Sequence, residues 1–424
     1  MSASESQRVL HYLKAQLGLL TPAAERFEKL PLELVGAIAT NMDRWTLSTF
    51  RRTCSYVARC TDYHFRREYL STFRTDFSTG SLRRLKKRVQ DPEYAQGIRT
   101  LVLEAAPGGA KEYGRDPTFP VLGDYCKWLR DADGQIILDQ ESVTKWQDMI
   151  RQLPNSRFFR LAGDLPNLRR PNNQLLGTTD ASRMILHIIK ALQIPVISFD
   201  VGIRWLGEGS GTDLGRCNVG EFVDDASFKK AWANLKSFTI TGSTPSAAGH
   251  PATKMILAAK NLKQLTIGTS ILPDFILQEL SANGDSLKLE EIQFVKTDIF
   301  YESTDEALGF LLTQRKSLKR LEFHDTVCHK LWTDILGPMK AAGFPALEKL
   351  TFECCYHADP NPRWVKSIVV SGACRKLRPG KSELTRFRWT QASNFGEPSG
   401  WAVRGPGAPT SVYVMEEMAD LAHW

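Results

Sequence analysis

The stretch Leu235-Lys-Ser-Phe238-Thr-Ile240 recurs four more times in the second half of this 424-residue chain. The later copies are Leu262-Lys-Gln-Leu265-Thr-Ile267, Leu289-Glu-Glu-Ile292-Gln-Phe294, Leu318-Lys-Arg-Leu321-Glu-Phe323 and Leu347-Glu-Lys-Leu350-Thr-Phe352. Their leading leucines are 27, 27, 29 and 29 residues apart. Alternating apolar and polar side chains are typical of a strand with one buried face, and a near-constant spacing is typical of structural repeats. We therefore expect a stack of strands.

Helix-like segments separate these strands. Apolar residues at helical spacing occur within residues 252–259, 274–280, 304–313 and 331–340. Each repeat thus consists of a strand, a loop and a helix, and stacking the repeats buries a core shared by a parallel sheet and an outer row of helices. The predicted fold class is α/β, a curved β/α solenoid with parallel strands that is clearest over residues 235–357.

These repeats resemble leucine-rich repeats. That family places Asn or Cys five residues after the second apolar position, where the side chain satisfies backbone groups of the turn. The equivalent positions in this chain hold Ser243, Ser270, Thr297, Thr326 and Cys355. Hydroxyl and thiol groups can partly replace that role, so we expect irregular repeats rather than a different fold.

Weaker copies of the strand pattern extend the repeat domain to residues 73–393. They are the segments 98–103, 158–161, 196–200 and 384–389. The stretches 105–120 and 207–220 are rich in glycine and are expected to be irregular loops. Residues 394–424 carry many Gly and Pro residues and are expected to form a C-terminal loop or tail, which could end in a short helix near residues 412–421.

The N-terminal part is expected to be helical. Residues 1–24 contain an amphipathic segment, and residues 25–72 contain two apolar stripes that fit two or three short helices. One stripe runs through Leu34, Val35 and Ile38, and the other runs from Trp45 to Val57. A module of this size buries little apolar surface by itself, so its outward apolar residues are expected to meet a partner or the next domain.

The segment Leu30-Pro31-Leu32-Glu33-Leu34, followed by Ile38, Leu47, Phe50, Arg51, Thr53-Cys54 and Val57, resembles an F-box. The region from Ser81 to Leu103 is similar to a pattern common in fungal F-box proteins. The resemblance implies that the module docks on the Skp-type linker protein of a cullin-RING (SCF) ubiquitin ligase. By position in the motif, the linker contacts would be Leu30, Pro31, Leu34, Ile38, Leu47 and Phe50. The alternative is a helical cap that seals the end of the repeat domain.

Resemblance to leucine-rich repeats also implies that polar strand positions line a concave face that binds a protein substrate. These positions are Gln264, Thr266, Glu291, Gln293, Arg320, Glu322, His324, Lys349, Thr351, Glu353, Arg386 and Arg388. Their mixed charges favour a protein surface over a uniformly cationic nucleic-acid groove. The predicted function is substrate recognition by a ubiquitin-ligase adaptor, and the main alternative is a ligase-independent interaction scaffold.

Composition points to a soluble protein of the cytoplasm or nucleus. Hydrophobic residues make up 42% of the chain and charged residues 24%, which is ordinary for a globular protein. The sequence shows neither a signal peptide nor an apolar segment long enough to span a bilayer. The eight cysteines contain no C-x-x-C pair, as expected of reduced thiols in an intracellular protein.

No motif indicates catalysis, a cofactor or a metal. The stretch Gly207 to Gly215 lacks the spacing and the Gly-Lys-Ser/Thr sequence of a phosphate-binding loop. The cysteines and histidines at 324, 328, 329, 354, 355 and 357 fit no common zinc pattern, so packed or solvated side chains are expected there. The chain is therefore predicted not to be an enzyme.

A basic segment supports a third hypothesis. Residues 44–99 contain thirteen Lys and Arg against five Asp and Glu, which accounts for the whole net charge of +8. Such a patch could attract nucleic acid, a membrane surface or an acidic protein, and the nucleic-acid hypothesis places binding between Arg51 and Arg88. Because Leu82, Leu85 and Val89 recur at helical spacing, we instead expect a surface helix with one buried edge at residues 83–88.

Overall fold

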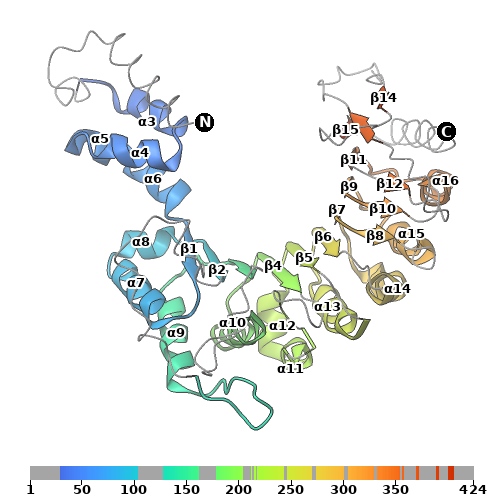
Figure 1. Cartoon of the computed structure of the whole chain (residues 1–424), viewed down its shortest axis with the longest axis horizontal. Helices are drawn as coiled ribbons and strands as arrows, with labels where there is room; N and C mark the ends of the chain where they lie inside the picture. The colour runs from blue at the N-terminus through green and yellow to red at the C-terminus, as the bar shows by residue number, and fades with distance from the viewer. Residues whose placement is uncertain are drawn as a thin grey trace. The chain divides into compact units, whose positions relative to one another are not determined.

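The computed structural model describes residues 29–103, 128–161, 178–203, 212, 214–215, 217–242, 246–269, 274–299, 304–328, 332–353, 356–357, 369–371, 388–390 and 400–404. The chain divides into two compact units (Figure 1). Met1–Phe73, Leu85–Thr100 and Gln152–Ser156 form the first, which we call the helical unit. The remaining residues form the second, which we call the sheet unit. The predicted N-terminal segment 1–24 lies outside the described residues.

Four short helices form most of the described helical unit, rather than the expected two or three. They are α3 (Leu32–Thr40), α4 (Arg44–Arg51), α5 (Ser55–Cys60) and α6 (Asp62–Tyr69). Local capping explains where α4 and α5 begin. The Asp43 carboxylate accepts a hydrogen bond of 2.8 Å from the backbone amide of Thr46, and the Cys54 sulfur accepts one of 3.5 Å from that of Val57.

The helical unit has a small core of its own. Val35, Ala39, Leu47, Phe50 and Val57 are buried together, and partly buried side chains such as Phe65 pack around them. The chain continues through helix α7 (Thr79–Val89) to α8 (Pro92–Gly97). In α7, Leu85 is buried while Lys86 and Lys87 are exposed, which confirms the predicted surface helix with one buried edge.

A wide open sheet organises the sheet unit. Its strand order is β1-β2-β3-β4-β5-β6-β7-β9-β11-β15. The strands are β1 (Thr72–Thr75), β2 (Thr100–Leu103), β3 (Phe158–Leu161), β4 (Ser198–Ile203), β5 (Ser237–Gly242), β6 (Gln264–Thr269), β7 (Glu291–Val295), β9 (Arg320–His324), β11 (Lys349–Glu353) and β15 (Gly400–Arg404). Strands β3 to β11 run parallel, and β15 pairs antiparallel with β11.

The strand register follows the sequence repeat. Leu265 lies beside Ile292, which lies beside Leu321, which in turn lies beside Leu350. Because each of these residues is the second apolar position of its copy, one copy of the motif contributes one strand. All four are buried. The predicted α/β fold with stacked parallel strands is therefore confirmed.

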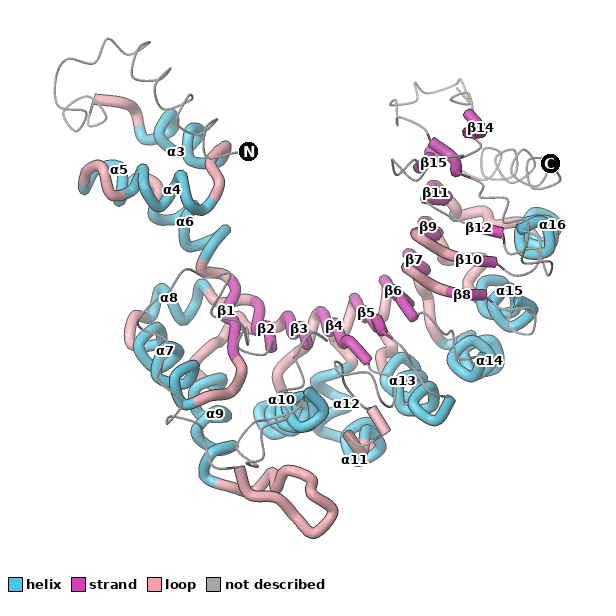
Figure 2. The backbone as a smooth tube through the Cα atoms, viewed as in Figure 1, coloured by secondary structure: helices cyan, strands magenta, loops and turns pink. Residues whose placement is uncertain are grey.

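Helices cover one side of the sheet. In Figure 2 the strands from β4 to β11 follow one another along an arc, and the helices of the sheet unit lie outside it. These helices are α9 (Glu141–Arg151), α10 (Thr178–Leu192), α11 (Val219–Val223), α12 (Ala226–Trp232), α13 (Ser246–Ala258), α14 (Asp274–Asn283), the 3-10 helix η1 (Gly284–Ser286), α15 (Thr304–Thr313) and α16 (Trp332–Ala342). Among the described residues, no helix of this unit lies on the other side, which we call the sheet face.

A second, very short strand follows the main strand in three repeats. Strands β8 (Asp298–Ile299), β10 (Val327–Cys328) and β12 (Tyr356–His357) form a parallel sheet of their own. The backbone turns between the main and short strands through Lys296 and Asp325, which have φ values of 52° and 49°. The residues that follow them, Thr297 and Thr326, are buried and hold two of the positions where leucine-rich repeats carry Asn or Cys.

The C-terminal part differs from the expectation. Residues 384–389 were predicted to add a parallel strand, but β14 (Arg388–Thr390) pairs antiparallel with β13 (Val369–Ser371) in a separate two-stranded sheet. The predicted tail from 394 onward contains β15, which adds an antiparallel strand to the main sheet. Alternation of apolar and polar residues predicts the strands that belong to the repeats. Antiparallel pairing of β15 with β11 depends instead on how the intervening chain folds back, which the local pattern does not show.

Candidate interaction surfaces

The structure corrects two of the predicted linker contacts. Leu47 and Phe50 are buried in the core of the helical unit and pack with Val35 and Val57. Side chains in that position stabilise the packing of the four helices, and they are too buried to contact a partner protein. The F-box resemblance had placed them at the contact because apolar residues of a helix look alike in sequence whether they face inward or outward.

Leu30 and Ile38 have an intermediate position. Both are partly buried and pack against the core. The Tyr56 hydroxyl donates a hydrogen bond of 2.7 Å to the Leu30 carbonyl oxygen, which ties the segment before α3 to α5. These two residues therefore support the surface, while Pro31 is exposed beside them.

Large apolar side chains are exposed at the start of α3 and on α4. Leu32 is 55% exposed, Leu34 is 51% exposed and Trp45 is 81% exposed. We use the name apolar patch for these three exposed residues of the helical unit, two of which lie on α3 and one on α4. Only Leu34 was among the predicted contacts. Trp45 had been grouped with Leu47 in one apolar stripe, but it lies two positions before Leu47, so a helix turns it away from the core by about 200°.

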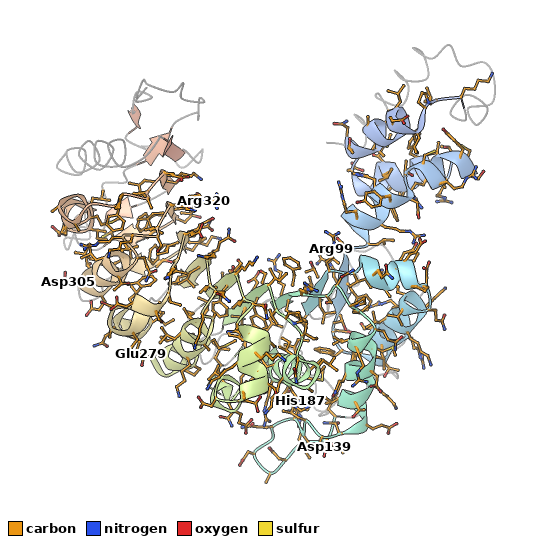
Figure 3. All side chains as sticks on the ribbon, turned by 180° about the vertical axis from the view of Figure 1, so that it is seen from behind. Arg99, Asp139, His187, Glu279, Asp305 and Arg320 are labelled. Atoms are coloured by element: carbon orange, nitrogen blue, oxygen red, sulfur yellow. The ribbon has the colours of Figure 1, made fainter. Side chains whose placement is uncertain are left out.

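The sheet face collects most of the residues predicted to bind a substrate. Register pairs Gln264 with Glu291, Glu291 with Arg320, and Arg320 with Lys349, and the next row contains Thr266, Gln293, Glu322 and Thr351. Figure 3 shows Arg320 on this side of the sheet, whereas Glu279 of α14 and Asp305 of α15 lie on the helical side. The strand alternation read from the sequence therefore placed these side chains on the expected face.

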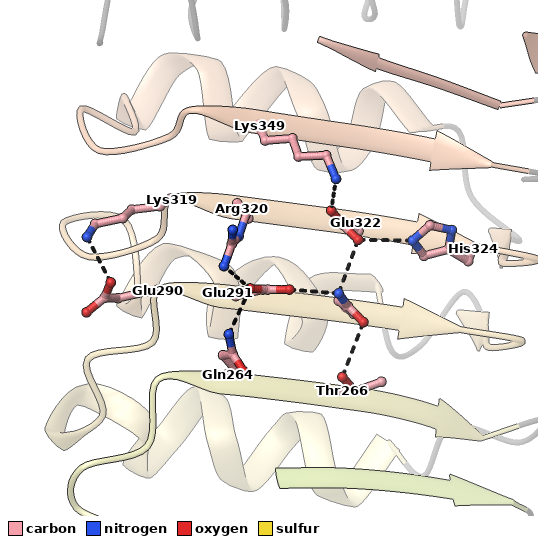
Figure 4. Close-up of polar contacts among 10 residues, drawn as sticks. Gln264, Thr266, Glu290, Glu291, Lys319, Arg320, Glu322, His324 and Lys349 are labelled. Atoms are coloured by element: carbon pink, nitrogen blue, oxygen red, sulfur yellow. Dashed lines mark hydrogen bonds and ion pairs between the residues drawn. The ribbon is translucent and has the colours of Figure 1, made fainter. Parts of the chain in front are cut away.

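Two glutamates organise the polar contacts of this face (Figure 4). Glu291 accepts hydrogen bonds from the amide of Gln264 at 3.2 Å and from the amide of Gln293 at 2.8 Å, and it forms an ion pair with Arg320. The Gln293 amide nitrogen also donates to Glu322 at 3.1 Å. A single glutamine therefore bridges the carboxylates of two neighbouring strands.

Glu322 is the more buried of the two carboxylates. His324 Nε2 lies 3.2 Å from it, and Lys349 forms an ion pair with it. The hydrogen bond with His324, supported by Lys349, lowers the pKa of Glu322 from its ordinary 4.5 to about 2, although burial acts in the opposite direction. The carboxylate is therefore charged at neutral pH and fixed in place by its neighbours.

Other predicted face residues are not all placed on this surface. Thr351 of β11 lies beside Glu322 in the same row of the sheet face and, like it, is 7% exposed. For Glu353 the structure describes only the backbone, which is paired with that of His324. Arg388 belongs to the separate sheet of β13 and β14, so its prediction as a residue of the main sheet face was wrong. Arg386 lies outside the described residues.

The face extends beyond the predicted residues. Arg160 of β3 and Asp200 of β4 form an ion pair of 3.2 Å. Just before the strands begin, Glu290 forms ion pairs with Lys263 at 3.0 Å and with Lys319 at 2.8 Å. The sequence carried a signal for the last three, because each directly follows the leading leucine of its repeat.

Several arginines of the basic segment are already paired. Arg51 lies 2.7 Å from Asp62, and Arg66 lies 2.5 Å from both Asp62 and Glu93. Arg51 also stacks on the Phe65 ring, and Arg88 on that of Phe73. These arginines stabilise the packing of the helical unit, which leaves less uncompensated charge for nucleic acid than the sequence suggested.

The sites considered for cofactors and metals remain without structural support. Within the described ranges, no group of three or more His, Cys, Asp or Glu residues is arranged to hold a metal ion. His329, Cys354 and Cys355 lie outside those ranges, as does most of the Gly-rich stretch at 207–215. None of the helices in the described part of the chain combines the length and apolar composition needed to cross a membrane.

A scan of the sequence against models of known protein families finds no match, and a search among curated proteins finds none.

Proposed function

We propose that this chain is the substrate-recognition adaptor of an SCF-type ubiquitin ligase. In this proposal the helical unit binds a Skp-type linker protein, and the sheet face binds a protein substrate. The chain forms no covalent bond itself and acts in the cytoplasm or nucleus. The single observation that carries the proposal is the apolar patch of Leu32, Leu34 and Trp45 on a unit that already has a complete core.

Burial of the apolar patch by a partner would contribute free energy to binding. Leu47 and Phe50 hold the helical unit together from inside, while Leu32, Leu34 and Trp45 remain largely in contact with water. Burying one such side chain contributes about 1.5–3 kcal/mol, so the three together can supply much of the free energy of a protein interface. Exposed apolar side chains that gather on one surface are typical of a binding site, and the proposal requires this of Leu32, Leu34 and Trp45.

The two surfaces suit a recruiting mechanism. An adaptor acts by proximity, because it holds lysines of the substrate near the ubiquitin-charged enzyme and raises their effective concentration. This requires one surface for the shared ligase and another for the substrate. The apolar patch and the sheet face belong to different compact units and differ in chemistry, one apolar and the other charged.

A binding experiment with the purified linker protein tests the proposal. The full chain should retain a Skp-type linker in a pull-down, and Leu32→Asp combined with Leu34→Asp should reduce recovery at least tenfold. Leu129→Asp is the matched control, since Leu129 is also a large exposed apolar residue but lies in the sheet unit. Its recovery should equal that of the wild type.

Equal recovery of the linker by the wild type and the double variant, or no recovery by either, would contradict the ligase function. The helical unit would then serve as a cap or as a contact for some other protein, which is the scaffold hypothesis. Arg51 and Arg66 are engaged in ion pairs within their own unit, so nucleic-acid binding through this segment is the weaker alternative.

A further inference from the structure

The ion pairs of the sheet face share an asymmetry of exposure. In each pair the cation is more exposed than the carboxylate that it contacts. The side-chain exposures are 48% for Arg320 against 13% for Glu291, 63% for Arg160 against 29% for Asp200, and 21% for Lys349 against 9% for Glu322. Carboxylates therefore form the floor of this face, and cations project from it.

The strand starts repeat this arrangement. Lys263 and Lys319 both contact the single carboxylate of Glu290. Glu348 follows Lys319 in the same row, because its backbone amide donates a hydrogen bond of 2.8 Å to the Lys319 carbonyl oxygen. Lys236 lies in the same row, because its backbone carbonyl accepts a hydrogen bond of 2.9 Å from the Lys263 amide, and its side chain is exposed. The row therefore contains three lysines and two glutamates, Glu290 and Glu348, and carries a net charge of +1.

Acceptor groups on the floor are already occupied. The Glu291 carboxylate contacts Arg320, Gln264 and Gln293, and that of Glu322 contacts Gln293, His324 and Lys349. A cationic visitor would have to displace these partners before it could reach a carboxylate. An anionic ligand can contact the exposed guanidinium and ammonium groups without displacing the hydrogen bonds and ion pairs of the carboxylates. Charge complementarity thus selects the sign of the ligand.

The middle of the face is lined by small polar side chains. Ser237 and Thr239 of β5 lie in register with Gln264 and Thr266 of β6. Arg160 on β3 and Arg320 on β9 stand on either side of this strip, separated by five strand intervals in the sheet order. At about 4.8 Å for each interval they are roughly 24 Å apart, which an extended segment of about seven residues can span.

We propose that the sheet face binds an acidic segment of a protein, whose Asp and Glu carboxylates contact Arg160, Lys263, Lys319 and Arg320. This names the class of substrate that the proposed adaptor recruits and in that sense rests on the proposed function. A protein segment fits better than nucleic acid. Closely spaced carboxylates of the floor repel a continuous phosphate backbone, whereas a peptide can place its acidic residues beside the cations and neutral residues elsewhere.

Fluorescence anisotropy tests the proposal with the full chain and no linker protein present. The probe is a short labelled peptide of alternating glutamate and serine. Lys319→Gln combined with Arg320→Gln should weaken binding by about fivefold or more, because two exposed charges are lost. Glu291→Gln should tighten binding about twofold or more, because it removes a negative charge from the floor. These opposite signs are specific to the proposed arrangement.

The matched control is Lys229→Gln combined with Lys230→Gln. Both lysines are exposed on α12, which covers the other side of the sheet, so the net charge changes equally. Its affinity for the peptide should stay within twofold of the wild type. Arg160→Gln, at the opposite side of the strip, should weaken binding about twofold or more and covers the case in which the double variant does not fold.

Three results would overturn the proposal. They are absence of binding to the acidic peptide, equal weakening by the α12 control, and binding of single-stranded poly-uridylate that is tighter than peptide binding and is lost in the same variants. The last result would reassign the face to nucleic acid. Because the linker protein is absent, failure here leaves the linker pull-down unaffected, and failure of that pull-down leaves this assay unaffected.

Discussion

The hydroxyl of Thr326 lies 3.3 Å from the backbone carbonyl oxygen of Phe294, which belongs to the preceding repeat. It also lies 3.1 Å from the carbonyl oxygen of His324 in its own repeat. Thr297 has the same relationship to Ile267 and Val295, with both distances at 3.2 Å. Each buried hydroxyl thus connects two repeats where a main strand ends. The resemblance to leucine-rich repeats had implied a role of this kind, the satisfaction of backbone groups in the turn, for these positions.

Replacement of Thr326 by valine should destabilise the sheet unit by about 1–2 kcal/mol, because a buried carbonyl oxygen loses its hydrogen bond while the side chain keeps its shape. Urea unfolding followed by tryptophan fluorescence measures this. Thr326→Ser, which retains the hydroxyl, should lose less than half as much. If serine and valine are equally destabilising, the hydroxyl bond between the repeats contributes nothing and the methyl group accounts for the effect.

The helical unit should respond differently to substitution inside and outside its core. Leu47→Ala should destabilise it by about 2–4 kcal/mol, because the side chain is buried among Val35, Phe50 and Val57. Leu32→Ala should change its stability by less than about 0.5 kcal/mol. Hydrogen exchange of α3 to α6 in the full chain reports on this unit separately. Similar losses of protection in both variants would mean that Leu32 belongs to the core.

The stability contributed by Glu322 should depend on pH. Its pKa is lowered from 4.5 to about 2 in the folded protein, so its stabilising effect is complete above the unfolded value and is lost as the pH falls from 4.5 towards 2. Glu322→Gln should therefore be destabilising by about 1–3 kcal/mol near neutral pH. The difference from the wild type should shrink as the solution is acidified.

Urea titrations of the wild type and Glu322→Gln at a series of pH values give that difference directly, since all other acidic groups are common to both proteins. A difference that stays constant between about pH 6 and pH 3 would show that His324 and Lys349 do not stabilise the charged carboxylate.

Gly268 in β6 should not tolerate a larger residue. A Cβ atom at this position would lie 3.0 Å from the side chain of Thr241 and 3.0 Å from the carbonyl oxygen of Val295, on the two neighbouring strands. Gly268→Ala should cost about 1–3 kcal/mol in urea unfolding. Gly36→Ala is the control and should increase stability. Its Cβ would meet nothing within 4 Å, and alanine stabilises the interior of helix α3 by about 0.5–1 kcal/mol relative to glycine.

Much of the architecture could be predicted from periodicity. The segment 158–161 coincides with β3, and 304–313 coincides with α15. Helices α9, α10, α11 and α12 were not predicted, because they lie where the spacing between strands becomes irregular. The antiparallel strand β15 was missed for another reason: its partner β11 precedes it by some 50 residues, and a local pattern carries no information on such a distant pairing.

The sheet face and the apolar patch illustrate the same contrast. Alternation along a strand determines which side chains share a face, so Gln264, Glu291 and Arg320 could be placed together from the sequence. In the short helices, the motif resemblance placed Leu47 at the interface and left Trp45 out. The structure places these two residues in the reverse positions, with Leu47 buried and Trp45 exposed.

The sequence by itself determined the stack of parallel strands, because its apolar positions recur every 27 or 29 residues and each copy can bury them only against its neighbours. Only the tertiary structure decided which charged side chains are exposed to solvent and which are partly buried. Arg320 is more exposed than Glu291, and Leu32 is exposed while Leu47 is buried. Both differences depend on side chains contributed by other segments of the chain. A linear pattern records the type and order of residues but not the depth at which packing leaves them.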